Sequence, residues 1–166
     1  MLEDSGQPMI VSACLVGMHC VCYPPIVLED EETIALVRNG RAIPICPEQA
    51  GGLPTPRAAA GIVGGTGDDL WKSPDVHYVR TTEGRDVTEA FMSGAQEVLR
   101  LARLAGSRKV LLRDGSPSCG VEFTNAYDEN GTLRRISGRG VVAPLLESAG
   151  IEVLSYEARD RQPDHT

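Results

Sequence analysis

The chain has 166 residues, 42% of them hydrophobic, which is enough to bury the core of one domain. A formal net charge of −7 and an aromatic content of only 4% argue against binding to nucleic acid backbones, anionic membranes or stacked single-stranded bases. No apolar stretch reaches the roughly 20 residues that a membrane span needs, and nothing resembles a signal peptide, so we expect a cytoplasmic protein.

The first half of the chain predicts a strand, a short helix and a second strand. An apolar run over 8–14 ends at Cys14. An acidic cluster then opens a helical pattern over 29–40, which stops at a glycine. The second strand is expected over 41–46, where it ends at Cys46 and is followed by proline.

A long proline- and glycine-rich stretch covers residues 47–86. Loops of this length inside a compact domain are usually functional or disordered, and we interpret this one as a partly ordered flap over the site. Residues 76–80 within it are expected to form a small edge strand.

The second half predicts further alternation of helices and strands. A long helix with an apolar stripe is expected over 86–104, followed by a buried strand over 109–112 and a hairpin over 121–127 with 132–136. A helix over 140–149 and a last core strand over 151–155 complete the half. This order predicts an α/β fold, with a small Rossmann-like parallel sheet flanked by helices. We expect a single domain over 1–166, with its core over 8–157 and a polar tail over 158–166.

Three cysteines occupy equivalent places at predicted strand ends. Cys14 and Cys46 end the first two strands, and Cys119 follows the third within a turn bracketed by proline and glycine. Because chemistry in an open parallel sheet gathers at the carboxyl ends of the strands, we expect one site built from the three thiols. Thiolates suit iron–sulfur clusters and zinc, although a single buried cysteine is more often a small core residue.

Several motifs resemble the domain-of-unknown-function family 523, in order along nearly the whole chain. They are VSACLVG at 11–17, CPEQAGGLPTPR at 46–57, GRDVT at 84–88, SPSCG at 116–120, GRGV at 138–141 and GIEV at 150–153. The family includes thiouracil desulfidases, which hold a [4Fe-4S] cluster through three cysteines and remove sulfur from thiolated pyrimidines without net redox change. The resemblance implies Cys14, Cys46 and Cys119 as cluster ligands, with Glu48 and Ser116 as the catalytic acid–base and proton-handling groups.

One segment departs from the family pattern. Where members usually read Cys-Arg-Tyr-Asp-Gly, this chain has CVCYP at 20–24 and lacks the arginine and the acid. Cys20 and Cys22, with His19, offer soft ligands, and Cys20 is a reserve ligand should Cys14 not serve. The departure leaves the identity of the thiolated substrate open.

The leading hypothesis is therefore a [4Fe-4S]-dependent desulfidase acting on a small thiolated heterocycle such as thiouracil, which releases hydrogen sulfide. The alternatives are a zinc-dependent hydrolase at the same three cysteines, a non-catalytic sulfide or metal carrier, and a thiol redox protein using Cys20 and Cys22. The oligomeric state is not indicated by the sequence. Arg57, Arg113 and Arg139 are interpreted as structural or solvated residues, with the alternative that one of them contacts substrate carbonyls.

Overall fold

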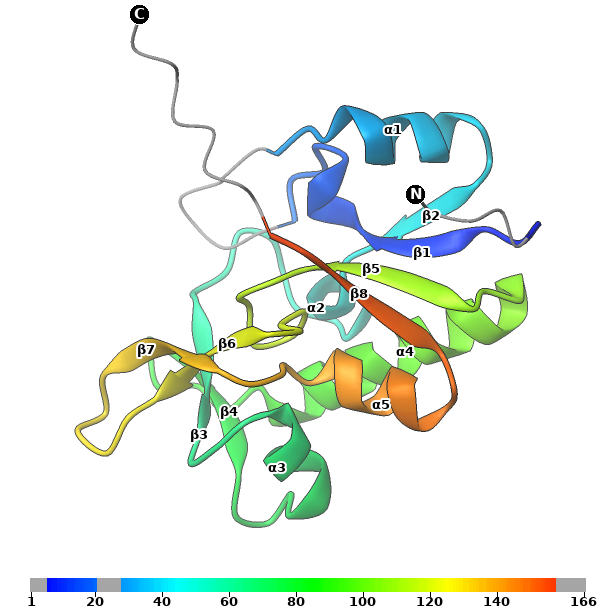
Figure 1. The fold of residues 1–166 in the computed structure, drawn as a ribbon. Coiled ribbons are helices and arrows are strands. Elements are labelled where there is room, and N and C mark those ends of the chain that lie inside the picture. Colours follow the sequence, from blue (N-terminus) through cyan, green and yellow to red (C-terminus); the bar gives the residue numbers. More distant parts are fainter. Residues whose placement is uncertain (1–5, 21–27, 158–166) are drawn as a thin grey trace, which may run out of the picture.

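A four-stranded parallel sheet forms the central layer of the computed structural model, which describes residues 6–20 and 28–157 (Figure 1). Every neighbouring pair of its strands is parallel. Because both faces of a parallel sheet are buried, its strands read as continuous apolar runs rather than alternating ones. In spatial order the strands are β2 (Ala42–Ile45), β1 (Met9–Ser12), β5 (Lys109–Arg113) and β8 (Glu152–Tyr156).

Helices cover both faces of this sheet (Figure 1). On one face α1 (Glu31–Arg38) contributes Leu36 and Val37 to a small apolar cluster that includes Val11. On the other face lie α4 (Thr88–Ala105) and α5 (Val142–Ser148). Successive residues of a strand point to opposite faces, so Ile10 joins this second and larger core, whose fully buried members include Val98, Val110, Leu112 and Leu146.

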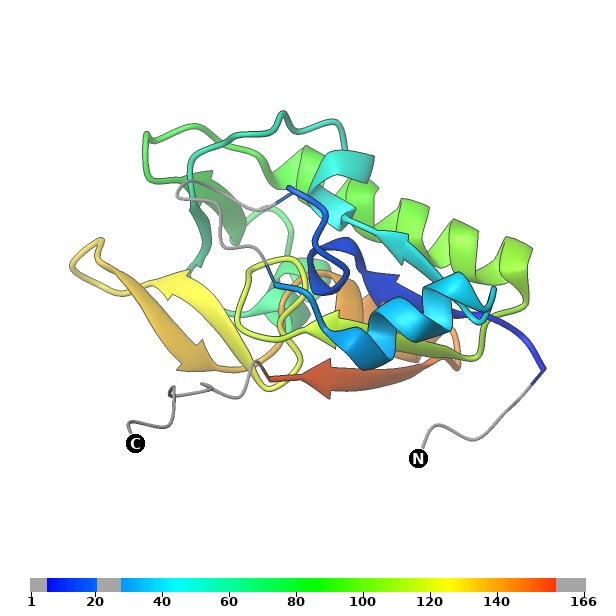
Figure 2. The same cartoon turned by 90° about the horizontal axis from the view of Figure 1, so that it is seen from above.

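A second four-stranded sheet lies on the side to which the carboxyl ends of the first sheet point (Figure 1, Figure 2). Its central pair of strands is parallel and both outer pairs are antiparallel. In spatial order the strands are β4 (Tyr78–Thr81), β3 (Ala60–Val63), β6 (Phe123–Tyr127) and β7 (Leu133–Ser137). The second sheet therefore forms a wall beside the end of the first sheet where the predicted site residues emerge.

The prediction of a flap across 47–86 is too broad, because the stretch contains two short helices and two strands. It contains α2 (Pro47–Ala50), β3, α3 (Gly67–Lys72) and β4. Its glycines allow close packing within the second sheet, since a Cβ at Gly61 would lie 2.3 Å from Cδ1 of Leu133. The longest irregular segment is 51–59, with shorter ones between the later elements, and the predicted edge strand is confirmed as β4.

Two glycines let α2 pack directly on α4. A Cβ at Gly51 would lie 1.9 Å from the carbonyl oxygen of Ala90, and a Cβ at Gly94 would lie 2.0 Å from that of Pro47. The two helices thus meet backbone to backbone, where only glycine fits. This contact positions the short helix that carries Glu48.

Replacing Gly94 with alanine is expected to destabilise the protein by about 1–3 kcal/mol, because the added methyl group overpacks the contact between α2 and α4. The displaced α2 should also lower whatever activity depends on Glu48. Urea denaturation of the variant measures the loss of stability. Ser93→Ala, on the exposed face of the same helix, is the control and should be neutral or slightly stabilising; equal stability of the two variants would contradict the close contact.

Most predicted elements of the first and second halves are confirmed. The short helix, the long helix, the hairpin and all four core strands lie within a few residues of their expected bounds. The Rossmann-like parallel sheet is confirmed, whereas the second sheet was not predicted as a unit. No helix in 6–20 or 28–157 is both long and apolar enough to cross a membrane. The predicted tail at 158–166 lies outside the described residues.

Candidate functional site

The three predicted cysteine ligands, together with Cys20, line a cavity of about 350 Å³ between the two sheets. Cys14 lies in a single 3-10 turn, Ala13–Leu15, that follows β1 directly. Cys46 follows β2 and begins α2, and Cys119 lies in the loop between β5 and β6. The three cysteines thus converge at the carboxyl end of the parallel sheet, as predicted.

A fourth cysteine is packed against two of them. Cys20 is only 2% exposed and forms a small cluster with Ala13, Cys14 and Cys46. The hydrogen bond from Cys20 lowers the pKa of Cys14 to about 7 and that of Cys46 to about 6. The pKa of Cys20 itself is raised, because hydrogen bonding to the two neighbouring sulfurs, together with burial, favours its protonated form. Two of the three predicted ligands therefore form the thiolate, the form that binds metals, more readily than an ordinary cysteine.

Cys119 has a different environment. It is buried, and burial raises the pKa of its thiol to about 12. The Ser12 hydroxyl donates to its sulfur at 3.6 Å, and the hydroxyl oxygen of Ser118 lies 3.7 Å from the same sulfur. Such donors stabilise a thiolate, so the surroundings of Cys119 suit a sulfur that becomes charged on binding a metal centre.

A chain of hydrogen bonds joins Glu48 to Ser116. The Ser118 hydroxyl donates to Oε2 of Glu48 at 2.7 Å and lies 3.2 Å from the Ser116 hydroxyl. Ser116 in turn accepts from the backbone N–H of Cys119 at 2.8 Å. The two predicted catalytic residues are thus brought to one wall of the cavity, and Ser118 connects them.

Arg57 holds the other oxygen of the same carboxylate. Its Nε donates to Oε1 of Glu48 at 2.8 Å, and the side chains are only 8% and 15% exposed, respectively. Burial lowers the pKa of the Arg57 guanidinium, but the Glu48 carboxylate outweighs this effect, and the net shift is upward. The prediction that Arg57 is structural or solvated understated its place, since it lines the cavity.

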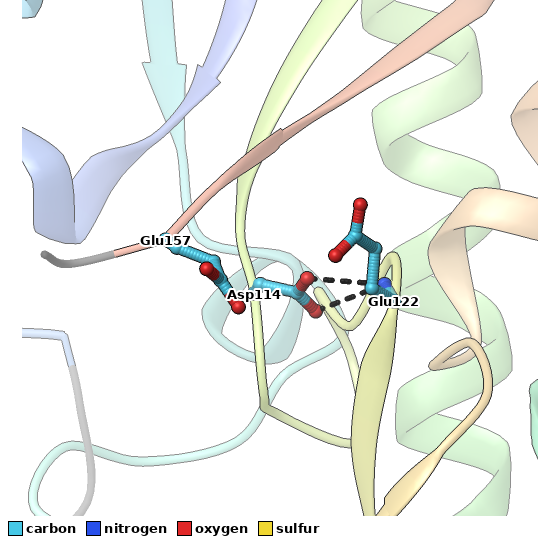
Figure 3. A group of neighbouring side chains, drawn as sticks. All are labelled: Asp114, Glu122 and Glu157. Carbon is cyan, nitrogen blue, oxygen red and sulfur yellow. Dashed lines mark hydrogen bonds between the residues drawn. The ribbon is translucent and has the colours of Figure 1, made fainter.

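Asp114 anchors the loop that carries Ser116, Ser118 and Cys119. In Figure 3 its carboxylate points at the backbone N–H of Glu122, which donates to Oδ1 at 3.2 Å and to Oδ2 at 3.0 Å. It also accepts from three further backbone N–H groups and one hydroxyl, those of Gly115, Val121, Phe123 and Ser155. Burial opposes ionisation, but these donors outweigh it and lower the pKa of Asp114. The carboxylate thus has a structural role, because it joins the start of the loop at Gly115 to its end at 121–123.

The three thiols are spaced more widely than the ligands of a single tetrahedral zinc ion. A tetrahedral zinc ion with Zn–S bonds of about 2.3 Å brings its thiolates to within roughly 3.8 Å of one another. Among the residues that the structure describes, only Asp114, Glu122 and Glu157 bring three such ligand atoms within 4.8 Å of one another, so the cysteine trio is wider than a zinc site. A cubane cluster binds each thiolate through a different iron and suits such a wider set of soft donors.

Comparison with known proteins agrees with this geometry. A sequence model of the 2-thiouracil desulfurase family matches residues 9–158. This chain belongs to that family. It is 40% identical over 147 residues to YbbK of Bacillus subtilis (strain 168), an uncharacterised protein, and the match covers 89% of this chain and 94% of YbbK. It also resembles the solved structure of TudS, a [4Fe-4S]-dependent thiouracil desulfidase, with a TM-score of 0.72, 37% identity and 90% of each chain covered.

Membership of this 2-thiouracil desulfurase family confirms the resemblance inferred from the motifs. Of the two residues that sequence reasoning underrated, Ser118 lies inside the SPSCG motif and Arg57 ends the CPEQAGGLPTPR motif. Their place within these motifs could have identified both residues as site residues. Of the cysteine-rich segment, His19 is exposed, whereas Cys22 lies outside the described residues.

Proposed function

We propose that this protein removes sulfur from a small thiolated heterocycle such as thiouracil, releasing it as hydrogen sulfide without net redox change. Its cofactor would be a [4Fe-4S] cluster held by Cys14, Cys46 and Cys119. The observation that carries the proposal is the meeting, in one cavity, of three soft ligands with a carboxylate and two hydroxyls. TudS, which the chain resembles over 90% of its length, is named as an enzyme of this kind.

The donor set fits the cluster. Its three sulfurs come from separate segments of one cavity wall, and two of them have a lowered pKa. When bound through three cysteines, a [4Fe-4S] cluster leaves one iron without a protein ligand, and that iron can act as a Lewis acid toward a soft thiocarbonyl sulfur. The protein's own groups then have to supply and move protons.

Glu48 is the proposed general base. Its carboxylate would accept a proton from the water that attacks the ring carbon bearing the sulfur. Arg57 on one oxygen and Ser118 on the other hold the carboxylate in a single orientation at the cavity wall. A group fixed in this way needs little reorganisation when the proton moves.

Ser116 is the proposed group that handles the proton of the departing fragment. Its hydroxyl accepts from the Cys119 N–H and is linked to Glu48 through Ser118. Because a hydroxyl both donates and accepts, this chain allows a proton taken up at Glu48 to be passed toward the opposite side of the substrate. Ser118 is thus the connecting group between the two predicted catalytic residues.

The size of the cavity favours a small substrate. A volume of about 350 Å³ lies within the range of small-molecule sites and suits one heterocycle better than a folded nucleic acid. The acidic net charge of −7 points the same way, since a phosphate backbone would be repelled.

The decisive experiment is anaerobic purification followed by iron and acid-labile sulfide quantification, coupled to a sulfide-release assay on a panel of 2- and 4-thiopyrimidines. We expect a brown protein with about four irons per chain that releases hydrogen sulfide from at least one compound. Colourless, zinc-loaded protein would support the hydrolase alternative. A brown protein inactive on the whole panel would support the carrier.

A further inference from the structure

Arg57 stands in the irregular segment between α2 and β3, yet its guanidinium is buried at the site. Its side chain is 8% exposed. Besides the ion pair with Glu48, its Nη2 donates to the carbonyl oxygen of Cys20 at 2.5 Å and lies 3.8 Å from Sγ of Cys46. Its Nη1 lies 3.4 Å from the carbonyl oxygen of Pro54 and 3.3 Å from Oγ1 of Thr55. All three guanidinium nitrogens therefore have partners.

These partners belong to three separate segments of the chain. Glu48 and Cys46 lie at the start of α2, Cys20 follows the 3-10 turn after β1, and Pro54 belongs to the same loop as Arg57. A guanidinium has five donors in a rigid plane, so it can bind several segments at once in fixed geometry. A lysine ammonium cannot reach the same set from one position.

We propose that Arg57 is the positioning residue of this site, which holds the Glu48 carboxylate, the Cys46 sulfur and the Cys20 backbone together. The expected effect of Arg57 on catalysis rests on the proposed function. The contacts of Arg57 do not, because they are made within the protein alone. Arg57 acts through Glu48 and Cys46 rather than on the substrate.

The positive charge of Arg57 has a second consequence. It lies beside the sulfur of Cys46, one of the proposed cluster ligands. Charges and hydrogen bonds at ligand sulfurs set the reduction potential of an iron–sulfur cluster. Removing a positive charge there should make the bound cluster harder to reduce, although the reaction itself involves no net electron transfer.

Two variants separate the effect of the planar set of donors from the effect of the positive charge. Arg57→Gln removes the charge, and Arg57→Lys keeps the charge but loses the planar set of donors. The matched control is Arg139→Gln, which breaks another partly buried ion pair, with Asp68, away from the cavity. The double variant Glu48→Gln/Arg57→Gln leaves no unpaired charge at the site, which covers the case in which Arg57→Gln alone does not fold.

The first measurement uses metal-free protein. Alkylation of each cysteine is followed by peptide mass spectrometry, and we expect Cys20 to react several-fold faster in both Arg57 variants and in the double variant than in wild type or Arg139→Gln. This result does not depend on the cluster, so it tests the contacts even if the proposed function fails. An unchanged rate at Cys20 in all Arg57 variants would overturn the proposal.

The second measurement uses protein loaded anaerobically with its cluster. We expect kcat to fall about 10- to 100-fold in Arg57→Gln, the range typical of groups that orient metal ligands. The midpoint potential should shift downward in Arg57→Gln and stay near the wild-type value in Arg57→Lys. A potential and a kcat in Arg57→Gln that match those of Arg139→Gln would count against the positioning role, whereas a wild-type protein that binds no cluster would count against the proposed function instead.

Discussion

Replacing Glu48 with glutamine is expected to abolish thiouracil turnover while the protein keeps its cluster and its brown colour. The amide fills the same space but cannot accept a proton as a carboxylate does, so the loss should be about 10²- to 10⁴-fold in kcat. Glu48 is not one of the proposed ligands, and its two oxygens face Arg57 and Ser118 rather than a sulfur. Iron content and the visible absorption band should therefore match wild type, which anaerobic spectroscopy and a sulfide-release assay measure in parallel.

Ser118→Ala is the informative companion to Glu48→Gln. It removes one hydrogen-bond donor to the Glu48 carboxylate and breaks the connection to Ser116, but it leaves every charged side chain of the site in place. We expect a smaller loss of kcat than in Glu48→Gln, again with the cluster retained. Wild-type turnover in Glu48→Gln would exclude Glu48 as the base, and wild-type turnover in Ser118→Ala would exclude the proposed proton path to Ser116.

The convergence of the cysteines could be predicted from the sequence because it follows from the geometry of parallel strands. Apolar runs of four to six residues identify the strands, and each of Cys14, Cys46 and Cys119 follows such a run closely. In a parallel sheet these positions share one edge, whatever the details of the connecting helices. Glu48 was instead inferred from the family resemblance, and it lies two residues after Cys46 at the start of a helix.

The second sheet and the role of Arg57 could not be predicted in this way. The edge strand β4 and the hairpin of β6 and β7 were predicted one by one, whereas β3 was not. β3 is short and contains a glycine, and it becomes a strand by pairing with β4 and with β6, which begins at Phe123, 63 positions after Ala60. Local pattern does not report such long-range pairing. Arg57 stands in a loop without periodicity, and its burial results from contacts with segments 9 and 37 positions away.

Replacing Cys119 with alanine is expected to remove the cluster altogether. A trio of ligands that loses one member leaves two irons without protein ligands. Cys119 is buried, and its sulfur accepts a hydrogen bond from the Ser12 hydroxyl. Iron and sulfide should fall from about four of each per chain to background, and sulfide release should be lost with them. The measurement is metal and sulfide quantification after anaerobic reconstitution, with a thermal melt to show that the variant folds.

Cys20→Ala is the matched control for Cys119→Ala, because both thiols are buried and both lie at the same cavity. Cys20 contacts Cys14 and Cys46 through its thiol, but its backbone carbonyl, which Arg57 binds, survives the substitution. The alanine variant should therefore keep the iron and its brown colour. If Cys20→Ala lost the cluster while Cys119→Ala kept it, the ligand set would have to be rebuilt around Cys20. Loss in neither variant, together with a reducible disulfide at Cys20, would favour the thiol redox alternative.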